Sequence, residues 1–596
     1  MKRLFWIVLS AMLLIACVVS ASGEASVLPE GATFERVNLH QGYPSDAEKS
    51  SENRGDVWYL SAELEAENVW YYKSSNPTDN IMYAPVYILF ADVTADEDAL
   101  AALDNAGLLQ LAEENGGHAF VIGKNNGEAW NEADVEVFRS VEVYILGEGV
   151  PLAWGGGYIP WGMSFGQRTF LFAEGEAADY VTEYLSRNAQ RIAGVCLVNA
   201  TAVPAEAGTL PIPAYLVNAD EAVIDYYKAL NGTDTEEAAA NGVRYVNGAE
   251  TIMQMIVANE GQLNAALTAD FWSEIGQNTA RMCLGISIYY PSENFRTSQE
   301  FILTRLPNLE MLDMTEIRHP EGVLEGAAEI SEWYIYIPNS ILNDESGATY
   351  PLFVVAHGSG DHPEFEAESQ GYVELAGYEK CIVLSFRHQN LSGETVVSDV
   401  NKLIDAVIAE YPVDVSRIYM GGFSMGGMRT GAVMFADPTR FAGVVVLHSA
   451  NTGFVDADEN GLCDNWEELA ASFDIPLYYQ LGERDSLFDG DSQRATITQY
   501  ALLDEVNVSF TDLSEDNPFG VVVEGQELVS WNDSYSGMTY TKTLLPNADG
   551  IPMIELSFLR EAAHVHFCGN MFQAWDFLSQ FSRAEDGSLI YTPAAE

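Results

Sequence analysis

RIYMGGFSMGGMRTGAVMFADPTRFAGVVVLH (417–448) contains an apolar run, a glycine-rich turn, a helical pattern and a second apolar run. GFSMG (422–426) matches the pattern G-x-S-x-G, which fits a strand that turns into a helix so sharply that larger flanking side chains would clash. This turn would expose the hydroxyl of Ser424 as a nucleophile, and the following helix N-terminus would favour developing negative charge.

Apolar runs and helical patterns alternate through the C-terminal half. Between two of the runs, residues 395–411 keep apolar side chains at i, i+3, i+4 and i+7, which is typical of an amphipathic helix. The runs mostly end in turn or polar residues and lie at 351–361, 381–386, 417–423, 443–449, 475–485 and 553–559. Strand and helix in alternation predict a doubly wound α/β sheet.

The N-terminal half repeats this order. Residues 168–199 align with 417–448 without a gap, and both stretches contain Arg, Ala-Gly-Val and apolar runs at matching places. Two further pairs of segments are similar: 84–96 with the segment that starts at 350, and 211–222 with 474–485. We interpret this as a duplication that gives two tandem α/β domains, at 24–320 and 325–596, joined through the mixed polar stretch 289–322.

The first copy lacks the polar residues that chemistry would need. In the alignment Ser424 lies opposite Gly175, His357 opposite Ala91, Gly358 opposite Asp92, and Asp485 opposite Ala222. All these positions differ together, so we expect the first domain to be degenerate and non-catalytic.

A serine nucleophile needs a base and an orienting carboxylate, in the chain order Ser, Asp, His for this kind of turn. Asp485 ends a strand-like run, with Glu483 as the substitute candidate. His564 and His566 follow the last strand, and residues two apart on an extended segment face opposite sides. Only one of them can therefore meet the acid and the serine.

Backbone N–H groups are expected to bind the oxyanion of the reaction. One would come from Met425, directly after the serine, and the other from the loop HGSG (357–360), with Ser359 as the donor. His388 and His448 also end strands near this place, and we expect them to be structural or substrate-contact histidines.

HGSGDHPEFEAES (357–369), GFSMGGM (422–428), GERD (482–485) and AWDFLSQFSR (574–583) resemble the α/β-hydrolase superfamily. Within it they are similar to secreted esterases of the polyhydroxybutyrate depolymerase and feruloyl or acetylxylan esterase kind. The resemblance covers roughly residues 330–590 and implies two tandem α/β-hydrolase-like sheets, the first one degenerate.

The resemblance also implies roles for single residues. It gives Ser424, Asp485 and His564 as the catalytic triad, with His564 preferred to His566 for its distance from the helix at Trp575. The long stretch 486–563 departs from the family and could form a lid or hairpin, so the ester substrate, small or polymeric, stays open. A serine peptidase of the same fold and a non-catalytic binding protein with two hydrolase-like modules are the alternatives.

The chain is strongly acidic, with 88 acidic and 28 basic residues and a formal net charge of −60. This charge argues against a nucleic-acid or anionic membrane surface. DADENGLCDNWE (456–467) has the spacing of a calcium loop, and no cofactor is expected for catalysis. Its predicted ligands to a structural Ca²⁺ are Asp456, Asp458, Asn460, Leu462, Asp464 and Glu467.

The N-terminus predicts export. Lys2 and Arg3 precede an apolar run and small residues, so residues 1–22 are interpreted as a signal peptide. Cys17 lies in a stretch similar to a bacterial lipobox, whereas an ordinary cleavage site is also present. We expect a bacterial protein that is either secreted or anchored at the cell surface by an N-terminal lipid.

Overall fold

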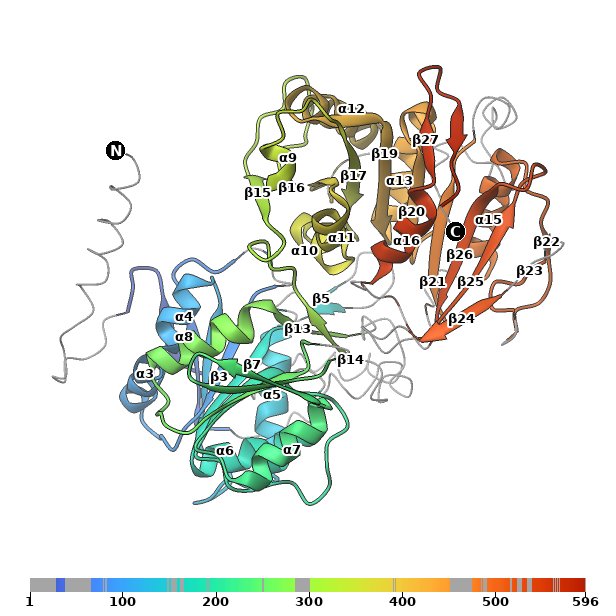
Figure 1. The fold of residues 1–596 in the computed structure, drawn as a ribbon. Coiled ribbons are helices and arrows are strands. Elements are labelled where there is room, and N and C mark those ends of the chain that lie inside the picture. The colour runs from blue at the N-terminus through green and yellow to red at the C-terminus, as the bar shows by residue number, and fades with distance from the viewer. Residues whose placement is uncertain are drawn as a thin grey trace.

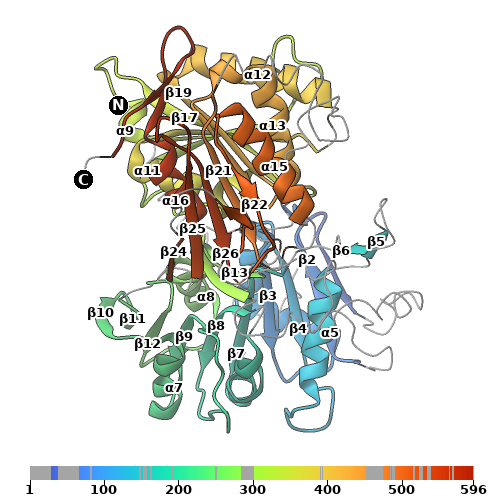
Figure 2. The same ribbon diagram turned by 90° about the vertical axis from the view of Figure 1, so that its right-hand side faces the viewer.

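The structure is a computed structural model that describes residues 28–37, 66–283, 301–450 and 474–594, with short gaps inside these ranges. The predicted signal peptide with Cys17 and the predicted calcium loop lie outside the described residues. Two ten-stranded mixed sheets form two bodies, the first at the lower left and the second at the upper right of Figure 1, and the second above the first in Figure 2. Among the described helices, none has both the length and the apolar character to cross a membrane.

The first sheet lies between two helical layers. Buried side chains of α3 (Asp96–Asn105), α4 (Leu108–Glu114) and α8 (Ala265–Glu274) pack on one face. Those of α5 (Asp134–Leu146), α6 (Glu176–Tyr180) and α7 (Glu221–Asn231) pack on the other. In spatial order the strands are β1 (Thr33–Arg36), β2 (Val69–Lys73), β4 (His118–Ile122), β3 (Val86–Phe90), β7 (Thr169–Glu174), β8 (Ile192–Val198), β9 (Ala214–Val217), β12 (Gln254–Ala258), β11 (Gly242–Val246) and β10 (Thr235–Ala239).

The second sheet has the same build, and Figure 2 shows α12 (Gly393–Glu410), α13 (Met425–Ala436) and α15 (Gly490–Leu503) on one side of it. Helices α11 (Tyr372–Glu379) and α16 (Asn570–Leu578) lie on the other side, where α10 (Pro363–Ser369) also packs against the sheet. In spatial order the strands are β15 (Met314–His319), β16 (Trp333–Pro338), β18 (Ile382–Phe386), β17 (Tyr350–Ala356), β19 (Val413–Phe423), β20 (Gly443–Leu447), β21 (Leu477–Gly482), β26 (Pro552–Leu559), β25 (Thr539–Pro546) and β24 (Val529–Asn532).

Short elements complete the described chain. The helical turns are η2 (Val181–Leu185), η3 (Ser186–Asn188), η4 (Gly276–Asn278), α9 (Asn339–Leu342) and η7 (Pro438–Arg440). The two-stranded ribbons are β5 (Gly149–Pro151) with β6 (Tyr158–Pro160), β13 (Thr279–Cys283) with β14 (Phe301–Arg305), β22 (Ser509–Phe510) with β23 (Val521–Val522), and β27 (Phe581–Arg583) with β28 (Leu589–Tyr591).

The two sheets agree strand for strand, in spatial order and in the direction of every pairing. The central six strands run parallel, and antiparallel strands close both edges. This confirms the tandem arrangement predicted from the sequence. The strand order and the alternation with helices are those of the α/β-hydrolase type, with the active-site edge at the carboxyl ends of the parallel strands.

Strand register fixes which residues are equivalent. Val86 pairs with Thr169 in the first sheet as Leu352 pairs with Ile418 in the second. The pairs Val195–Ala214 and Val444–Leu477 correspond in the same way. Counting along the strands from these pairs makes Ala91, Asp92, Gly175 and Ala222 the counterparts of His357, Gly358, Ser424 and Asp485, as in the sequence alignment.

A buried arginine is repeated in both domains. Arg281 donates from Nε to the carbonyl of Ile192 at 3.1 Å, and Arg583 donates from Nε to the carbonyl of Phe441 at 2.7 Å. Each guanidinium also donates to a backbone carbonyl just before the next parallel strand: Arg281 to Pro211 before β9, and Arg583 to Asp474 before β21. Each arginine thereby fixes the ribbon after the sheet to two neighbouring parallel strands.

The second sheet begins earlier than the predicted boundary. β15 is its edge strand and ends at His319, before residue 325. The polar stretch 289–322 therefore contains the first strand of the second domain as well as the connection. β15 pairs on one side only and buries Met314 alone, so its sequence lacks the continuous apolar run of a buried strand.

The glycines that flank Ser424 have no room for a side chain. A Cβ at Gly426 would lie 1.9 Å from the carbonyl oxygen of Ala356, and one at Gly422 would lie 2.4 Å from the same atom. We expect Gly426→Ala to lower the free energy of unfolding by about 3 kcal/mol, since crowding of a packed core typically costs this much. Urea denaturation of the full chain measures it.

Gly175→Ala, at the tip of the first domain's elbow, is the uncrowded comparison for that substitution. Its Cβ would meet nothing within 4 Å, so only the positive φ of 63° opposes it, at a cost of about 1 kcal/mol. Equal losses of unfolding free energy in the two variants would show that the contact with Ala356 does not exclude a side chain at position 426.

Candidate active site

Ser424 occupies a sharp turn between β19 and α13. Its φ of 53° and ψ of −120° are strained for a residue with a side chain, and its N–H donates to the carbonyl of Leu447 at 2.9 Å. Gly175 has nearly the same angles, 63° and −127°, and its N–H donates to Val198 at 2.9 Å. Both domains therefore keep the elbow, and only the second has a hydroxyl at its tip.

Asp485 lies just after β21 and binds two histidines through one oxygen. Its Oδ2 is 2.9 Å from Nδ1 of His564 and 3.0 Å from Nδ1 of His448. Burial alone would raise the pKa of Asp485, but the charge of His564 and the hydrogen bonds from both rings hold that pKa below its usual value. The ionised carboxylate can accept an N–H from each Nδ1 atom, and a histidine ring that donates from Nδ1 has Nε2 available as its acceptor.

His448 is the histidine that the sequence did not connect with the acid. It is fully buried at the end of β20, and its φ is 44°. Burial lowers the pKa of His448, so the ring is neutral at pH 7. Its Nε2 is buried and has no hydrogen-bond partner among the described residues. Because β20 and β21 are adjacent, residues that follow both strands come together at one edge, which is a usable signal.

Phe423 connects the elbow with the histidine loop. Its ring centroid lies 4.4 Å from that of His564 and 4.0 Å from that of His566. Ser424 follows Phe423 directly, so the elbow lies next to the Asp485–His564 pair. The structure thus brings the acid and His564 into contact and places the nucleophile candidate beside the residue that packs on that imidazole.

His566 has a different set of partners, as the alternation of an extended segment predicts. Its Nε2 lies 3.0 Å from Glu366 and 3.3 Å from Asp361, and all three side chains are largely buried. Burial would lower the pKa of His566, but the two carboxylates raise it to about 9. Burial raises the pKa of Glu366 to about 7. His566 is therefore a buried imidazolium beside the candidate site.

Glu483, the substitute acid, points elsewhere. It forms an ion pair with Arg560 at 3.2 Å and has a side chain 35% exposed, in contrast to the buried Asp485. Asp485 is thus the carboxylate at the histidines.

Hydrogen bonds with Gln389 and the stacking of His357 on His388 hold the loop 357–360 in place. Gln389 accepts from the N–H of Gly360 at 2.8 Å and donates to Oγ of Ser359 at 3.4 Å. The ring of His357 stacks on that of His388 at 4.2 Å, and burial lowers the pKa of His357 to about 4, so the ring is neutral. Met425 is the first residue of α13, and its N–H therefore has no acceptor within the helix.

An ion pair occupies the corresponding place in the first domain. Lys124 lies 3.0 Å from Asp92 and 3.3 Å from Glu176. By strand register these three residues are the counterparts of His388, Gly358 and Met425. His118 is the histidine that the described part of this domain contains, and it bonds the hydroxyl of Tyr71 at 2.8 Å. The described residues of the first domain thus offer no histidine at their elbow.

Three groups of described side chains could hold a cation, because their ligand atoms lie within 4.8 Å of one another. In the first two groups, hydrogen bonds already join the members. The groups are His448 with Asp485 and His564, Asp361 with Glu366 and His566, and Glu316 with Glu364 and Glu368.

Comparisons with known proteins agree with the fold. Residues 384–467 match the prolyl oligopeptidase family. A bifunctional acetylxylan esterase/xylanase of Neocallimastix patriciarum is 28% identical over 103 residues, which are 16% of this chain and 15% of that protein. The chain therefore spans only a small part of this relative's length.

Solved structures are similar at low sequence identity. An acetyl xylan esterase from Aspergillus awamori is 14% identical, with a TM-score of 0.32, over 45% of this chain and 98% of that chain. An S-formylglutathione hydrolase from Staphylococcus aureus is 17% identical, with a TM-score of 0.25, over 32% of this chain and 83% of that chain.

The strand order and the elbow define a protein of the α/β-hydrolase type, with two tandem hydrolase-like domains. The predicted resemblance to the α/β-hydrolase superfamily is confirmed at this level by the strand order and by the match to the prolyl oligopeptidase family.

Proposed function

We propose that the protein is an exported serine esterase whose second domain hydrolyses carboxylic esters through an acyl-enzyme. The observation that carries the proposal is the 2.9 Å hydrogen bond between Asp485 and His564 beside the strained elbow of Ser424. Strain of this kind persists where the surrounding structure fixes it, and it is common at functional sites.

In the proposed mechanism, Nε2 of His564 takes the proton of the Ser424 hydroxyl while Oγ attacks the ester carbonyl. Asp485 keeps Nδ1 protonated and stabilises the imidazolium that forms. His564 then gives its proton to the leaving alcohol, and water repeats the sequence on the acyl-enzyme, which releases the acid and frees Ser424.

The oxyanion of each tetrahedral intermediate would be bound by backbone N–H groups of Met425 and Ser359. Two features support this choice. The N–H of Met425 has no acceptor within α13. In the loop, the N–H of Gly360 is bonded to Gln389 and that of Gly358 to Glu366, which leaves Ser359 as the glycine-flanked donor.

The substrate is proposed as a small or polymeric ester, because the relative from Neocallimastix is named for acetylxylan esterase activity. A serine peptidase is the second candidate, since residues 384–467 match a family named for an oligopeptidase. Acetyl, feruloyl and hydroxybutyrate esters, assayed beside a peptide anilide, discriminate between the two. Secretion or lipid anchoring and the structural Ca²⁺ in the loop 456–467 are further proposals that rest on the sequence.

A fluorophosphonate probe tests the nucleophile directly. We expect mass spectrometry of the labelled, folded protein to find the adduct on Ser424, because an activated serine attacks phosphorus as it attacks a carbonyl carbon. Protein unfolded in urea should not be labelled. A folded protein without an adduct on Ser424 would rule out nucleophilic catalysis by this residue.

A further inference from the structure

Helix α10 lies between the candidate active site and the first domain. It starts directly after the loop 357–360, and Figure 1 shows it on the side of the second domain that faces the first. Seven residues long, it carries Glu364, Phe365, Glu366 and Glu368.

The active-site side of α10 meets the histidine loop. Glu366 binds His566 at 3.0 Å, and Asp361, which precedes the helix, binds the same nitrogen at 3.3 Å. His566 lies two residues from His564, and its ring contacts that of Phe423 at 4.0 Å. These contacts join the oxyanion loop, the elbow and the base at one buried point.

The opposite side of α10 inserts into the first domain. The ring of Phe365 is fully buried and packs in an apolar cluster with Tyr83, Ala280 and Leu306, all of which belong to the first domain. The rings of Tyr83 and Phe365 meet edge to face at 5.0 Å. Phe365 also contacts the ring of His566 at 4.8 Å, so one side chain touches both the first domain and the active-site histidine loop.

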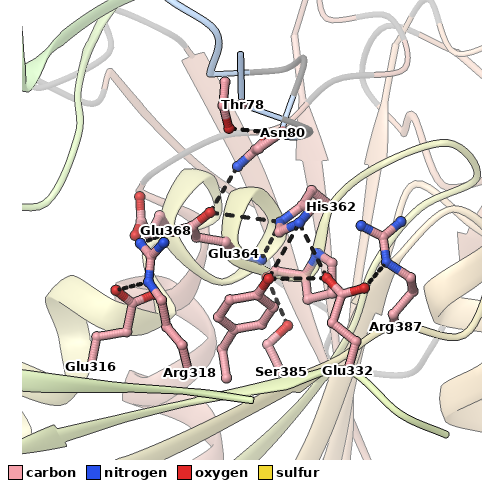
Figure 3. Close-up of polar contacts among 12 residues, drawn as sticks. Thr78, Asn80, Glu316, Arg318, Glu332, His362, Glu364, Glu368, Ser385 and Arg387 are labelled. Atoms are coloured by element: carbon pink, nitrogen blue, oxygen red, sulfur yellow. Dashed lines mark hydrogen bonds and ion pairs between the residues drawn. The ribbon is translucent and has the colours of Figure 1, made fainter. Parts of the chain in front are cut away.

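A polar contact accompanies the apolar one. Asn80 of the first domain donates to Glu364 at 3.1 Å, and Arg318 pairs with the same carboxylate (Figure 3). In the same view, Glu364 and Glu332 flank His362, the N-cap of α10. The start of the helix is thus fixed to the first domain as well as to the second sheet.

Tyr83 is held rigidly within its own domain. Arg168 is buried and donates to the carbonyl of Tyr83 at 3.3 Å and to the carbonyls of Gly276 and Gln277 at 3.2 and 3.0 Å. The guanidinium also lies over the ring of Trp272 at 5.0 Å. The surface against which Phe365 packs is therefore fixed to the first domain through the hydrogen bonds of Arg168.

We propose that Tyr83 of the non-catalytic first domain is a positioning residue for the second domain's active site. It holds α10 through Phe365, and α10 in turn holds the oxyanion loop and the His564–His566 loop. The inference rests on the proposed function. It assigns the degenerate domain a role in ordering catalytic groups.

The test compares Tyr83→Ala, Tyr83→Phe and Tyr227→Ala in the full-length protein. Tyr227 is a fully buried tyrosine in the first domain's own core, so its loss destabilises that domain without touching α10. We expect Tyr83→Ala to lower kcat for p-nitrophenyl acetate and the rate of fluorophosphonate labelling about tenfold at nearly unchanged KM, because small displacements of catalytic groups reduce the rate of the chemical step. Tyr227→Ala should retain kcat, and Tyr83→Phe, which keeps the ring but loses the hydroxyl beside Glu368 of α10, should retain most of it.

Hydrogen–deuterium exchange supplies a readout that does not depend on activity. Peptides within 357–370 should exchange faster in Tyr83→Ala than in Tyr227→Ala. Wild-type kcat and exchange in Tyr83→Ala, or equal losses of kcat in both alanine variants, would overturn the inference. A wild-type protein that reacts with no probe would contradict the proposed function instead, and exchange would still decide whether Tyr83 orders α10.

Discussion

Replacement of Ser424 by alanine is expected to lower kcat for p-nitrophenyl acetate by about 10⁶-fold, because loss of the nucleophile disables the whole triad. The remaining rate should stay above that in water, since backbone donors and binding still act on the transition state. Steady-state kinetics measures kcat, and the melting temperature checks folding. Unchanged hydrolysis in the variant would favour a binding protein with two inert modules.

The first elbow provides a matched control for that experiment. Adding Gly175→Ser to Ser424→Ala puts a hydroxyl on an equivalent backbone, where a Cβ meets nothing within 4 Å. We expect neither hydrolysis nor labelling at the new serine, since Ala222 replaces the acid and Lys124 pairs with Asp92 beside it. Restored activity would show that the elbow alone is sufficient.

The architecture of both domains could be predicted from the sequence because its signals are local or periodic. Buried parallel strands are continuous apolar runs, and the duplication shows itself as an alignment without gaps through 168–199 and 417–448. The strand pairing confirms that alignment at Val86, Thr169 and their counterparts. The edge strand β15 was not recognised, because an edge position lacks the apolar pattern of a buried strand.

The two elbows show what substitution patterns can hide. In the first domain Gly175 stands in place of Ser424, and Ala173 and Ala177 stand in place of the two flanking glycines. These replacements suggest that the turn itself changed. The backbone nevertheless keeps its φ and ψ, because glycine adopts a positive φ at little cost. What the first copy lacks is side-chain chemistry, while the fold around it is retained.

The partnership of Asp485 with His564 was predicted from the chain order and the family resemblance, but the contact between α10 and the histidine loop was not. Glu366 lies 200 residues from His566. Sequence spacing gives no signal for such pairs, because the sheet brings the ends of distant strands together. The buried arginines Arg281 and Arg583 belong to the same class, since they bond backbone carbonyls that any residue could supply.

The sharing of Asp485 by two histidines leads to the second large prediction. His564→Gln is expected to lower kcat by about 10⁶-fold, as loss of a triad base does. Glutamine can still donate an N–H to Asp485, but it has no nitrogen that accepts a proton, so the substitution removes base chemistry and keeps the hydrogen bond. Kinetics with p-nitrophenyl acetate and labelling by the fluorophosphonate both report the loss.

His448→Gln is the matched comparison, because His448 bonds the same oxygen at 3.0 Å and is equally buried. Here the amide replaces only a neutral donor to Asp485, and one hydrogen bond is worth about 1 kcal/mol, so kcat should fall less than about tenfold. The ring of His564 lies nearer to the elbow. Its centroid is 4.4 Å from that of Phe423, whereas the centroid of His448 is 5.6 Å away. If His564→Gln stayed active and His448→Gln did not, His448 at the end of β20 would be the base that takes the proton of Ser424.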